Sequence, residues 1–262
     1  MIVNEQETQN GYVKSEVHNH VAIIEFYHPK GNSLPARLLE KLSQEIDHAS
    51  HDEHVNVVLL RSAEHDVFCS GVSFNELAEI TNEHDATHFF MGFANVINSM
   101  RKCYKLIVAR VHGKCVGGGV GLAAAADYAI AVEGAEVKLS ELTMGIGPYV
   151  IAPALIRKMG LSAFSQIAID SHLWRNGDWA RRKGIFAELH PTKESMDESV
   201  ERLTHSLAKN SLEANYELKK LLWQGTENWD ELLAQKAAIT GRLLMHKQAR
   251  EFLSEYNKKV IF

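Results

Sequence analysis

The sequence predicts an α/β fold, in which a body of alternating strands and helices is followed by a helical C-terminal segment. Three observations indicate this fold. A strand–helix–strand pattern lies near the N-terminus, a later strand runs through three glycines into an alanine-rich helix, and the chain after Glu194 has helical periodicity without a convincing strand. We expect the α/β body to cover residues 1–191 and the helical segment to cover residues 192–262.

The first strand–helix–strand pattern comes from residues 17–60. Val17 to Tyr27 and Val55 to Leu60 are rich in β-branched and aromatic residues, which favours strands. Between them, Pro35 marks the first turn of a helix, and leucines follow it at roughly helical spacing. Such a unit builds a mainly parallel sheet.

The middle of the chain continues the alternation. The apolar stripe from Asp85 to Tyr104 has helical period, and we interpret it as core packing. Leu106–Val111, Tyr128–Val132 and Glu136–Leu139 are short strand candidates. This order indicates repeated β-β-α turns.

Three helices are expected in the C-terminal segment, over residues 199–207, 212–223 and 232–244. Their large apolar residues fit either a contact with another subunit or the core of the chain itself, and the pattern leaves both open: Trp223, Trp229, Leu232 and Leu233.

Charge and composition exclude some functions. The chain of 262 residues has 28 Lys+Arg against 33 Asp+Glu, a formal net charge of -5, so no overall positive field attracts nucleic acid. The first residues are neither basic nor apolar, and no apolar run approaches the ~20 residues that span a bilayer. We therefore expect a cytoplasmic protein without nucleic-acid or membrane partners.

The cysteines and histidines are the residues that would form disulfides or bind a metal ion. Cys69, Cys103 and Cys115 are widely spaced and odd in number, which favours reduced thiols. The three-residue spacing of His48, His51 and His54 could place them on one helix face, but their polar surroundings favour a solvated helix end. No metal site is expected.

The glycine-rich segment over residues 110–127 carries the strongest chemical signal. Glycines let the backbone approach a ligand closely, and the first amides of the following helix lack intrahelical partners. Such a corner can hold a phosphate or a developing oxyanion. A tight turn without a ligand explains the glycines about equally well.

A dinucleotide site must also be weighed, because residues 119–124 satisfy G-x-G-x-x-A and Glu141 follows at the distance of a ribose-binding acid. The helix is short for a Rossmann crossover, however, and more than a hundred residues precede the motif. We rank a dinucleotide-binding oxidoreductase lower.

Three motifs resemble those of the enoyl-CoA hydratase/isomerase (crotonase) family. Residues 68–73 (FCSGVS) resemble F-S-A-G-A-D, residues 112–119 (HGKCVGGG) resemble N-G-x-x-x-G-G-G, and residues 139–148 (LSELTMGIGP) are similar to F-x-x-P-E-x-x-L-G-I-x-P. Matches at residues 28–34 and 179–185 extend the resemblance over nearly the whole chain. It implies a crotonase-like spiral of β-β-α units.

The resemblance also implies a site. The backbone N–H groups of Val72 and Gly118 would form an oxyanion hole for a thioester oxygen, and Glu141 would transfer protons. Further residues would bind the substrate: Ser70, Gly71 and Gly117. The implied substrate is an acyl-CoA thioester that brings its own coenzyme A, with no separate cofactor, and the implied assembly is a homotrimer or homohexamer.

Two departures from the family pattern bear on the reaction. Where hydratases of the family commonly hold two glutamates, this sequence has Gly121 and Glu141. A lone carboxylate suffices to move a double bond, whereas water addition is harder to arrange. Bulkier residues at positions 147–153 also replace family glycines near the acyl pocket. We expect isomerisation or hydration, with a non-catalytic acyl-CoA-binding protein as the alternative.

Four polar residues have alternative roles outside catalysis. An isolated glutamate is usually a solvated surface residue, so Glu141 gains its weight from the motif. Asp127 matches a family aspartate that has a structural role. Glu76 and His112 lie near the oxyanion segments in sequence, and packing or surface roles are favoured for both.

Overall fold

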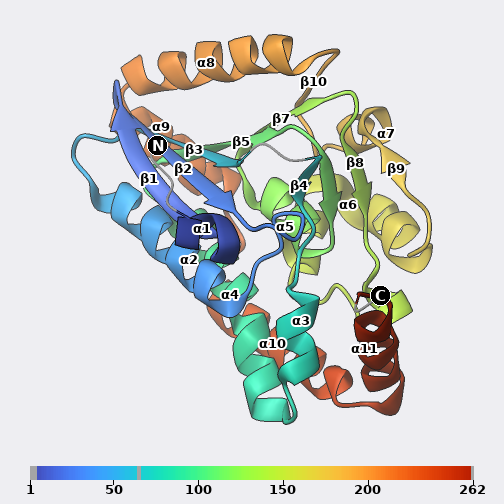
Figure 1. Cartoon of the computed structure of the whole chain (residues 1–262). Helices are drawn as coiled ribbons and strands as arrows, with labels where there is room; N and C mark the ends of the chain where they lie inside the picture. The colour runs from blue at the N-terminus through green and yellow to red at the C-terminus, as the bar shows by residue number, and fades with distance from the viewer. Residues whose placement is uncertain (1–4, 64–65, 261–262) are drawn as a thin grey trace.

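The computed structural model describes residues 5–63 and 66–260, which form two sheets surrounded by helices (Figure 1). The larger sheet has six strands, in the order β1 (Tyr12–His18), β2 (Val21–Tyr27), β3 (Val57–Ser62), β5 (Leu106–Val111), β7 (Tyr128–Val132) and β10 (Glu188–His190). The smaller sheet has four, in the order β4 (Val67–Cys69), β6 (Lys114–Val116), β8 (Glu136–Lys138) and β9 (Arg175–Asn176).

Each β-β-α repeat contributes its first strand to the larger sheet and its second strand to the smaller one. β3, β5 and β7 lie in parallel in the larger sheet, and the strands that follow them, β4, β6 and β8, lie in parallel in the smaller one. In the smaller sheet Cys69 of β4 is the partner of Cys115 of β6. The predicted β-β-α repeat is therefore confirmed.

Helices connect the turns and cover the sheets. The described helices of the body are α1 (Glu5–Asn10), α2 (Ala36–His51), α3 (Phe74–Glu79), α4 (Glu83–Lys102), α5 (Gly118–Ala125), the 3₁₀ helix η1 (Glu141–Met144), α6 (Ala152–Ile169) and α7 (Gly177–Arg182). The C-terminal helices are α8 (Lys193–Lys209), α9 (Leu212–Leu222), α10 (Trp229–Leu244) and α11 (Lys247–Val260).

One strand prediction is wrong. Residues 17–27 do not form a single strand, because the chain reverses at Asn19 and His20, which have φ values of 49° and 65°. Two residues with positive φ make the tight turn that joins antiparallel strands with the correct twist. β1 and β2 are the resulting hairpin.

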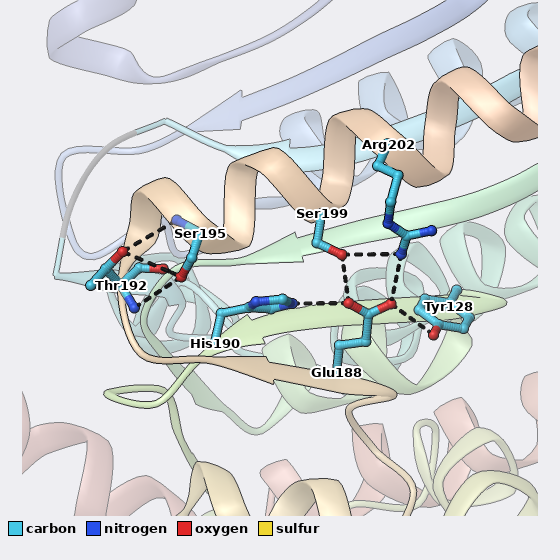
Figure 2. Close-up of polar contacts among 7 residues, drawn as sticks. All are labelled: Tyr128, Glu188, His190, Thr192, Ser195, Ser199 and Arg202. Carbon is cyan, nitrogen blue, oxygen red and sulfur yellow. Dashed lines mark hydrogen bonds and ion pairs between the residues drawn. The ribbon is translucent and has the colours of Figure 1, made fainter.

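Helix α8 lies along the larger sheet and is tied to it by polar contacts around Glu188 of β10 (Figure 2). The Glu188 carboxylate accepts hydrogen bonds from the hydroxyls of Tyr128 and Ser199 and pairs with Arg202 and His190. The helix begins with a capping box, in which Thr192 accepts from the Ser195 amide and the Ser195 hydroxyl lies within hydrogen-bond distance of the Thr192 amide.

Helix α9 is anchored by Asp127, which follows α5. One carboxylate oxygen accepts from the Ile107 amide at 2.7 Å and from Lys219 Nζ at 2.9 Å, and the other accepts from Trp223 Nε1 at 2.7 Å. The Lys219 and Asp127 side chains are 2% and 5% exposed, so this is a buried ion pair. Asp127 has a structural role, as the sequence indicated.

Four large apolar residues of the C-terminal segment pack inside the chain, whereas Leu218, Leu221 and Leu222 of α9 are exposed. Trp223, Trp229 and Leu233 are buried members of the main hydrophobic core, and Leu232 is half-buried against it. The core is thus continuous across residue 191, and the interpretation of these four side chains as intrachain packing is the one that the structure supports. None of the helices in the described ranges combines the length and apolarity that crossing a bilayer requires.

Candidate active site

A pocket of about 500 Å³, part of it open to solvent, lies where the loops after β4 and β6 meet. Residues from five segments line it: Ser70, Val72 and Phe74; Phe90 and Phe93; Val116, Gly117 and Gly118; Ser140, Glu141, Met144 and 146–151; and Thr240. Each predicted site residue either lines this pocket or, like Gly71, lies in a loop that forms it.

The backbone around two glycines holds the two loops together. Gly71 and Gly117 have φ values of 83° and 51°, a region that L side chains rarely adopt. A Cβ on Gly71 would lie 3.0 Å from the Gly118 nitrogen and 2.8 Å from the Val116 oxygen. Only a glycine allows the loop after β4 to approach the start of α5 this closely.

The amides of Val72 and Gly118 are available to a ligand. Both residues line the pocket, and no backbone carbonyl in the described ranges accepts from either N–H group. Gly118 is the first residue of α5, where the amides lack intrahelical partners and the helix dipole favours negative charge. The neighbouring Gly71 carbonyl accepts from Leu34, which fixes the Val72 segment in place.

Glu141 is the first residue of η1, and its carboxylate faces the glycine loop. A Cβ on Gly117 would lie 2.8 Å from Glu141 Oε1, so a side chain there would meet the carboxylate. The Oε2 atom is buried and has no hydrogen-bond partner among the described residues. Burial disfavours the ionised form and raises the pKa of Glu141 to about 7, from an ordinary value of 4.5.

The pocket wall beside Gly121 is apolar. Ile151 packs directly against this glycine, and both Ile151 and Val150 are buried lining residues. Tyr149 lies over Gly147, with its hydroxyl 2.9 Å from the position a Cβ would take there. Glu141 is the one carboxylate among the described residues that line the pocket.

Glu76 and His112 lie outside the pocket. Glu76 accepts a hydrogen bond from the Ala36 amide at 2.9 Å, at the start of α2, and His112 is buried without lining the cavity. Ser70 does line it, and its hydroxyl donates to the Lys30 carbonyl. The three cysteines are free, and all three are buried.

Two other kinds of site do not fit the described residues. No three His, Cys, Asp or Glu side chains in these ranges gather as metal ligands. A Rossmann helix would be longer than α5, which has eight residues and leads straight into β7, and Glu141 lies in a pocket and not at the end of a strand.

Sequence reasoning missed helix α11, which packs against a residue that lines the pocket. Phe74, a lining residue, packs against Tyr256 and Phe252 of α11 with ring centroids 4.6 Å and 6.3 Å away. The Arg250 guanidinium donates to the carbonyls of residues 77, 78 and 80 at the end of α3. The amphipathic pattern of residues 247–260 was the available signal for this helix.

Comparison with known proteins agrees with this geometry. A family model described as enoyl-CoA hydratase/isomerase matches residues 16–260. The chain is 31% identical over 153 residues to enoyl-CoA hydratase AKT6-1 of Alternaria alternata, covering 58% of this chain and 50% of that one. It is 30% identical over 117 residues to the mitochondrial methylglutaconyl-CoA hydratase of Homo sapiens, covering 45% and 34%. The chain spans about half the length, or less, of these curated relatives.

Solved structures show the same fold. An enoyl-CoA hydratase from Bacillus halodurans matches with a TM-score of 0.86 at 22% identity, covering 93% of this chain and 99% of that chain. An enoyl-CoA hydratase from Mycobacterium avium matches with a TM-score of 0.81 at 22% identity, covering 94% and 96%. The expected crotonase-like fold is confirmed.

Proposed function

The chain belongs to the enoyl-CoA hydratase/isomerase family, and on that premise we propose that it moves the double bond of an enoyl-CoA thioester, with Glu141 as the acid–base group. One observation supports isomerisation above all. Glu141 is the single carboxylate among the described lining residues, and the place beside Gly121 is filled by Ile151.

The thioester oxygen would bind between the Val72 and Gly118 amides. Removal of a proton next to the carbonyl places negative charge on that oxygen, and preorganised N–H donors stabilise the charge most strongly in a site with little water. Removal of one such donor typically costs about 2.7–4 kcal/mol of transition-state stabilisation. Ser70, Gly71 and Gly117 would shape the entry to this position.

Glu141 then carries out both proton transfers. Its ionised carboxylate takes a proton from C2 of a 3-enoyl thioester, and the electron pair of that C–H bond passes into the dienolate held by the two amides. The carboxylic acid so formed returns the proton to C4, and the double bond moves to C2–C3. A pKa near 7 suits a group that must act as base and then as acid at neutral pH.

The other lining residues fit the acyl part of the substrate. Phe90, Phe93, Met144 and Ile151 supply an apolar wall that excludes water from a reactive enolate. Coenzyme A would arrive as part of the substrate, so the reaction needs no separate cofactor. The homotrimer or homohexamer implied by the family resemblance, and the division at residue 191, remain predictions.

Hydration is the second candidate, because Tyr149 places a hydroxyl on the pocket wall that could help hold a water molecule for Glu141. The similar proteins from A. alternata and H. sapiens are also named hydratases. The two reactions give different products, so one assay separates them.

The test offers purified protein a 3-enoyl-CoA and a 2-enoyl-CoA and analyses the products by liquid chromatography, which separates the two isomers, coupled to mass spectrometry. Isomerisation interconverts the two without a change in mass, whereas hydration adds one water. We expect interconversion to exceed water addition. A 3-hydroxyacyl-CoA as the main product supports hydration, and tight binding of both thioesters without any turnover supports the non-catalytic alternative.

A further inference from the structure

A second cavity adjoins the catalytic pocket on the far side of Tyr149. It has a volume of about 890 Å³, including the part open to solvent, and Tyr149 lines both cavities. Its other walls come from α6, α10 and the turn between α9 and α10: Ala152, Pro153, Ile156 and Arg157; Trp229, Leu232 and Lys236; and Gln224, Gly225 and Thr226.

The second cavity lies next to the catalytic pocket along α10, and also along α6 and the residue that precedes it. On α10, Thr240 lines the catalytic pocket, while Lys236 and Leu232 line the second cavity. Residues four apart share a helix face, and a separation of four residues is about 6 Å along the axis. Along α6, the lining passes from Ile151 in the first cavity to Arg157 in the second.

The second cavity carries positive charge. Arg157 and Lys236 line it, and no acidic residue in the described ranges does so. The negative charge of Asp127 acts on Arg157 from an adjoining cavity that both residues line. Neighbouring carboxylates already have partners: Asp127 accepts from Lys219 and Trp223, and Glu227 accepts from the Gly225 amide.

Arg157 is held in position by an aromatic ring. Its guanidinium carbon lies 4.2 Å from the ring centroid of Trp223, whose own indole N–H is fixed on Asp127. Burial lowers the pKa of the Arg157 guanidinium, because the charge has lost part of its hydration. An anion in the cavity would supply the partner that water no longer provides.

We infer that the preferred substrate carries a carboxylate at the far end of its acyl chain, and that Arg157 and Lys236 bind this group beyond Tyr149. The inference rests on the proposed acyl-CoA function, because the thioester must sit beside Glu141 for its acyl chain to extend past Tyr149. Lys236 and Arg157 are then specificity-determining residues, while Glu141 and the two amides act on the thioester end.

Binding of unreactive thioesters tests the inference without requiring turnover. The probes are saturated acyl-CoAs of matched length with a methyl or a carboxylate end: hexanoyl- against adipoyl-CoA, and octanoyl- against suberoyl-CoA. Isothermal titration calorimetry gives Kd for each. We expect the carboxylate-ended probe to bind at least about tenfold more tightly than its methyl-ended partner at one length or both, as charged hydrogen bonds permit.

Variants assign the preference to the two cations. In K236M the ratio of the two Kd values should fall about tenfold, and in K236E it should invert. R157K keeps the charge and should retain more of the ratio than R157M, which also loses the stacking on Trp223. The matched control is K209M, which removes an exposed lysine at the end of α8, away from both cavities, and should leave the ratio unchanged.

Two outcomes overturn the inference. One is binding of the methyl-ended probe as tightly as, or more tightly than, the carboxylate-ended probe at both lengths. The other is an equal loss for both probes in K236M, which would mean that the cations bind the phosphates of coenzyme A instead of the acyl end. Failure of the proposed function is seen separately, as retained carboxylate preference in a protein that turns over no enoyl-CoA.

Discussion

A Cβ atom on Gly121 would lie 2.4 Å from Cγ2 of Ile151, a distance that no packed side chain tolerates. The two residues are thirty positions apart in the sequence, and they meet where α5 faces the start of α6. The absence of a side chain at Gly121 therefore leaves the space that Ile151 fills, and the apolar wall of the pocket depends on this packing.

Enlargement of Gly121 should destabilise the protein unless Ile151 is made smaller. We expect G121A to lower the free energy of unfolding by about 1–3 kcal/mol through overpacking, and I151A to lower it by about 2–5 kcal/mol through the loss of a buried side chain. In the double variant the new methyl group enters the vacated space, so its loss should be smaller than the sum by about 0.5–3 kcal/mol. Urea unfolding measures all four proteins, and strict additivity would show that the two sites are independent.

Replacement of the Glu141 carboxylate should remove turnover and spare binding. General acid–base groups contribute about 10²- to 10⁴-fold to the rate, so we expect kcat of E141Q to fall by at least about 10²-fold. Kd for a saturated acyl-CoA should change little, because the amide keeps the shape of the side chain.

The matched control for this experiment is E76Q. Glu76 lies outside the pocket and accepts from the Ala36 amide, a role that the oxygen of a glutamine can keep. Its turnover should remain close to that of the wild type. Full activity in E141Q would remove Glu141 from the mechanism.

The raised pKa of Glu141 predicts how activity depends on pH. The base must be ionised to accept the first proton, so kcat/KM should rise with pH and level off above about 7, the pKa of this carboxyl group. An unperturbed glutamate would give its inflection near 4.5 instead. The measurement is the initial rate at low substrate from pH 5.5 to 8.5, and a flat profile through pH 7 would contradict the assignment.

Glu141 also makes the free energy of unfolding depend on pH. This free energy should change with pH in the direction opposite to that of activity. Because the native state binds this proton more tightly than the unfolded chain, the free energy of unfolding should fall as pH rises from about 4.5 to about 7. E141Q has no such proton, so its stability should depend less on pH over this range. Chemical denaturation of both proteins at pH 5 and pH 8 gives the comparison.

The buried ion pair between Lys219 and Asp127 predicts a large effect of a lysine substitution. Lys219→Met leaves the Asp127 carboxylate buried with fewer donors, and loss of one partner of such a pair typically costs about 3–5 kcal/mol. Lys220→Met is the control, because the adjacent lysine is exposed and its contacts are with Glu217 and the Tyr216 ring on its own helix. Similar losses of unfolding free energy in both variants would show that the buried ion pair stabilises the protein no more than the exposed one.

Periodicity in the sequence was sufficient for most of the fold. The bounds of β5 and β7 agree with the predicted strands because their apolar runs are short and clearly delimited. The β1–β2 hairpin was missed because Asn19 and His20 interrupt the strand pattern by only two residues, and the preference for positive φ is weak outside glycine. Helix α11 was missed because its contacts with α3 involve residues far apart in the sequence.

The site was predictable where motifs specify backbone geometry. The glycines around Gly117 indicated close approach of the chain, whereas Gly71 was singled out only by the family resemblance. In the structure Gly117 lines the pocket, and a Cβ on Gly71 would meet the start of α5. The burial of Glu141 Oε2, the packing of Ile151 on Gly121 and the second cavity beyond Tyr149 depend on tertiary contacts. No local sequence pattern predicts these features.

The pairing of Cys69 with Cys115 in the smaller sheet sets the alignment of the two amide donors. Val72 and Gly118 each follow their cysteine by three residues, so both loops leave the sheet at the same level. Deletion of a single residue between either cysteine and its amide donor would move one N–H out of line with the other. The ability to hold an enolate therefore depends on an equal spacing of three residues in two segments that follow neighbouring strands.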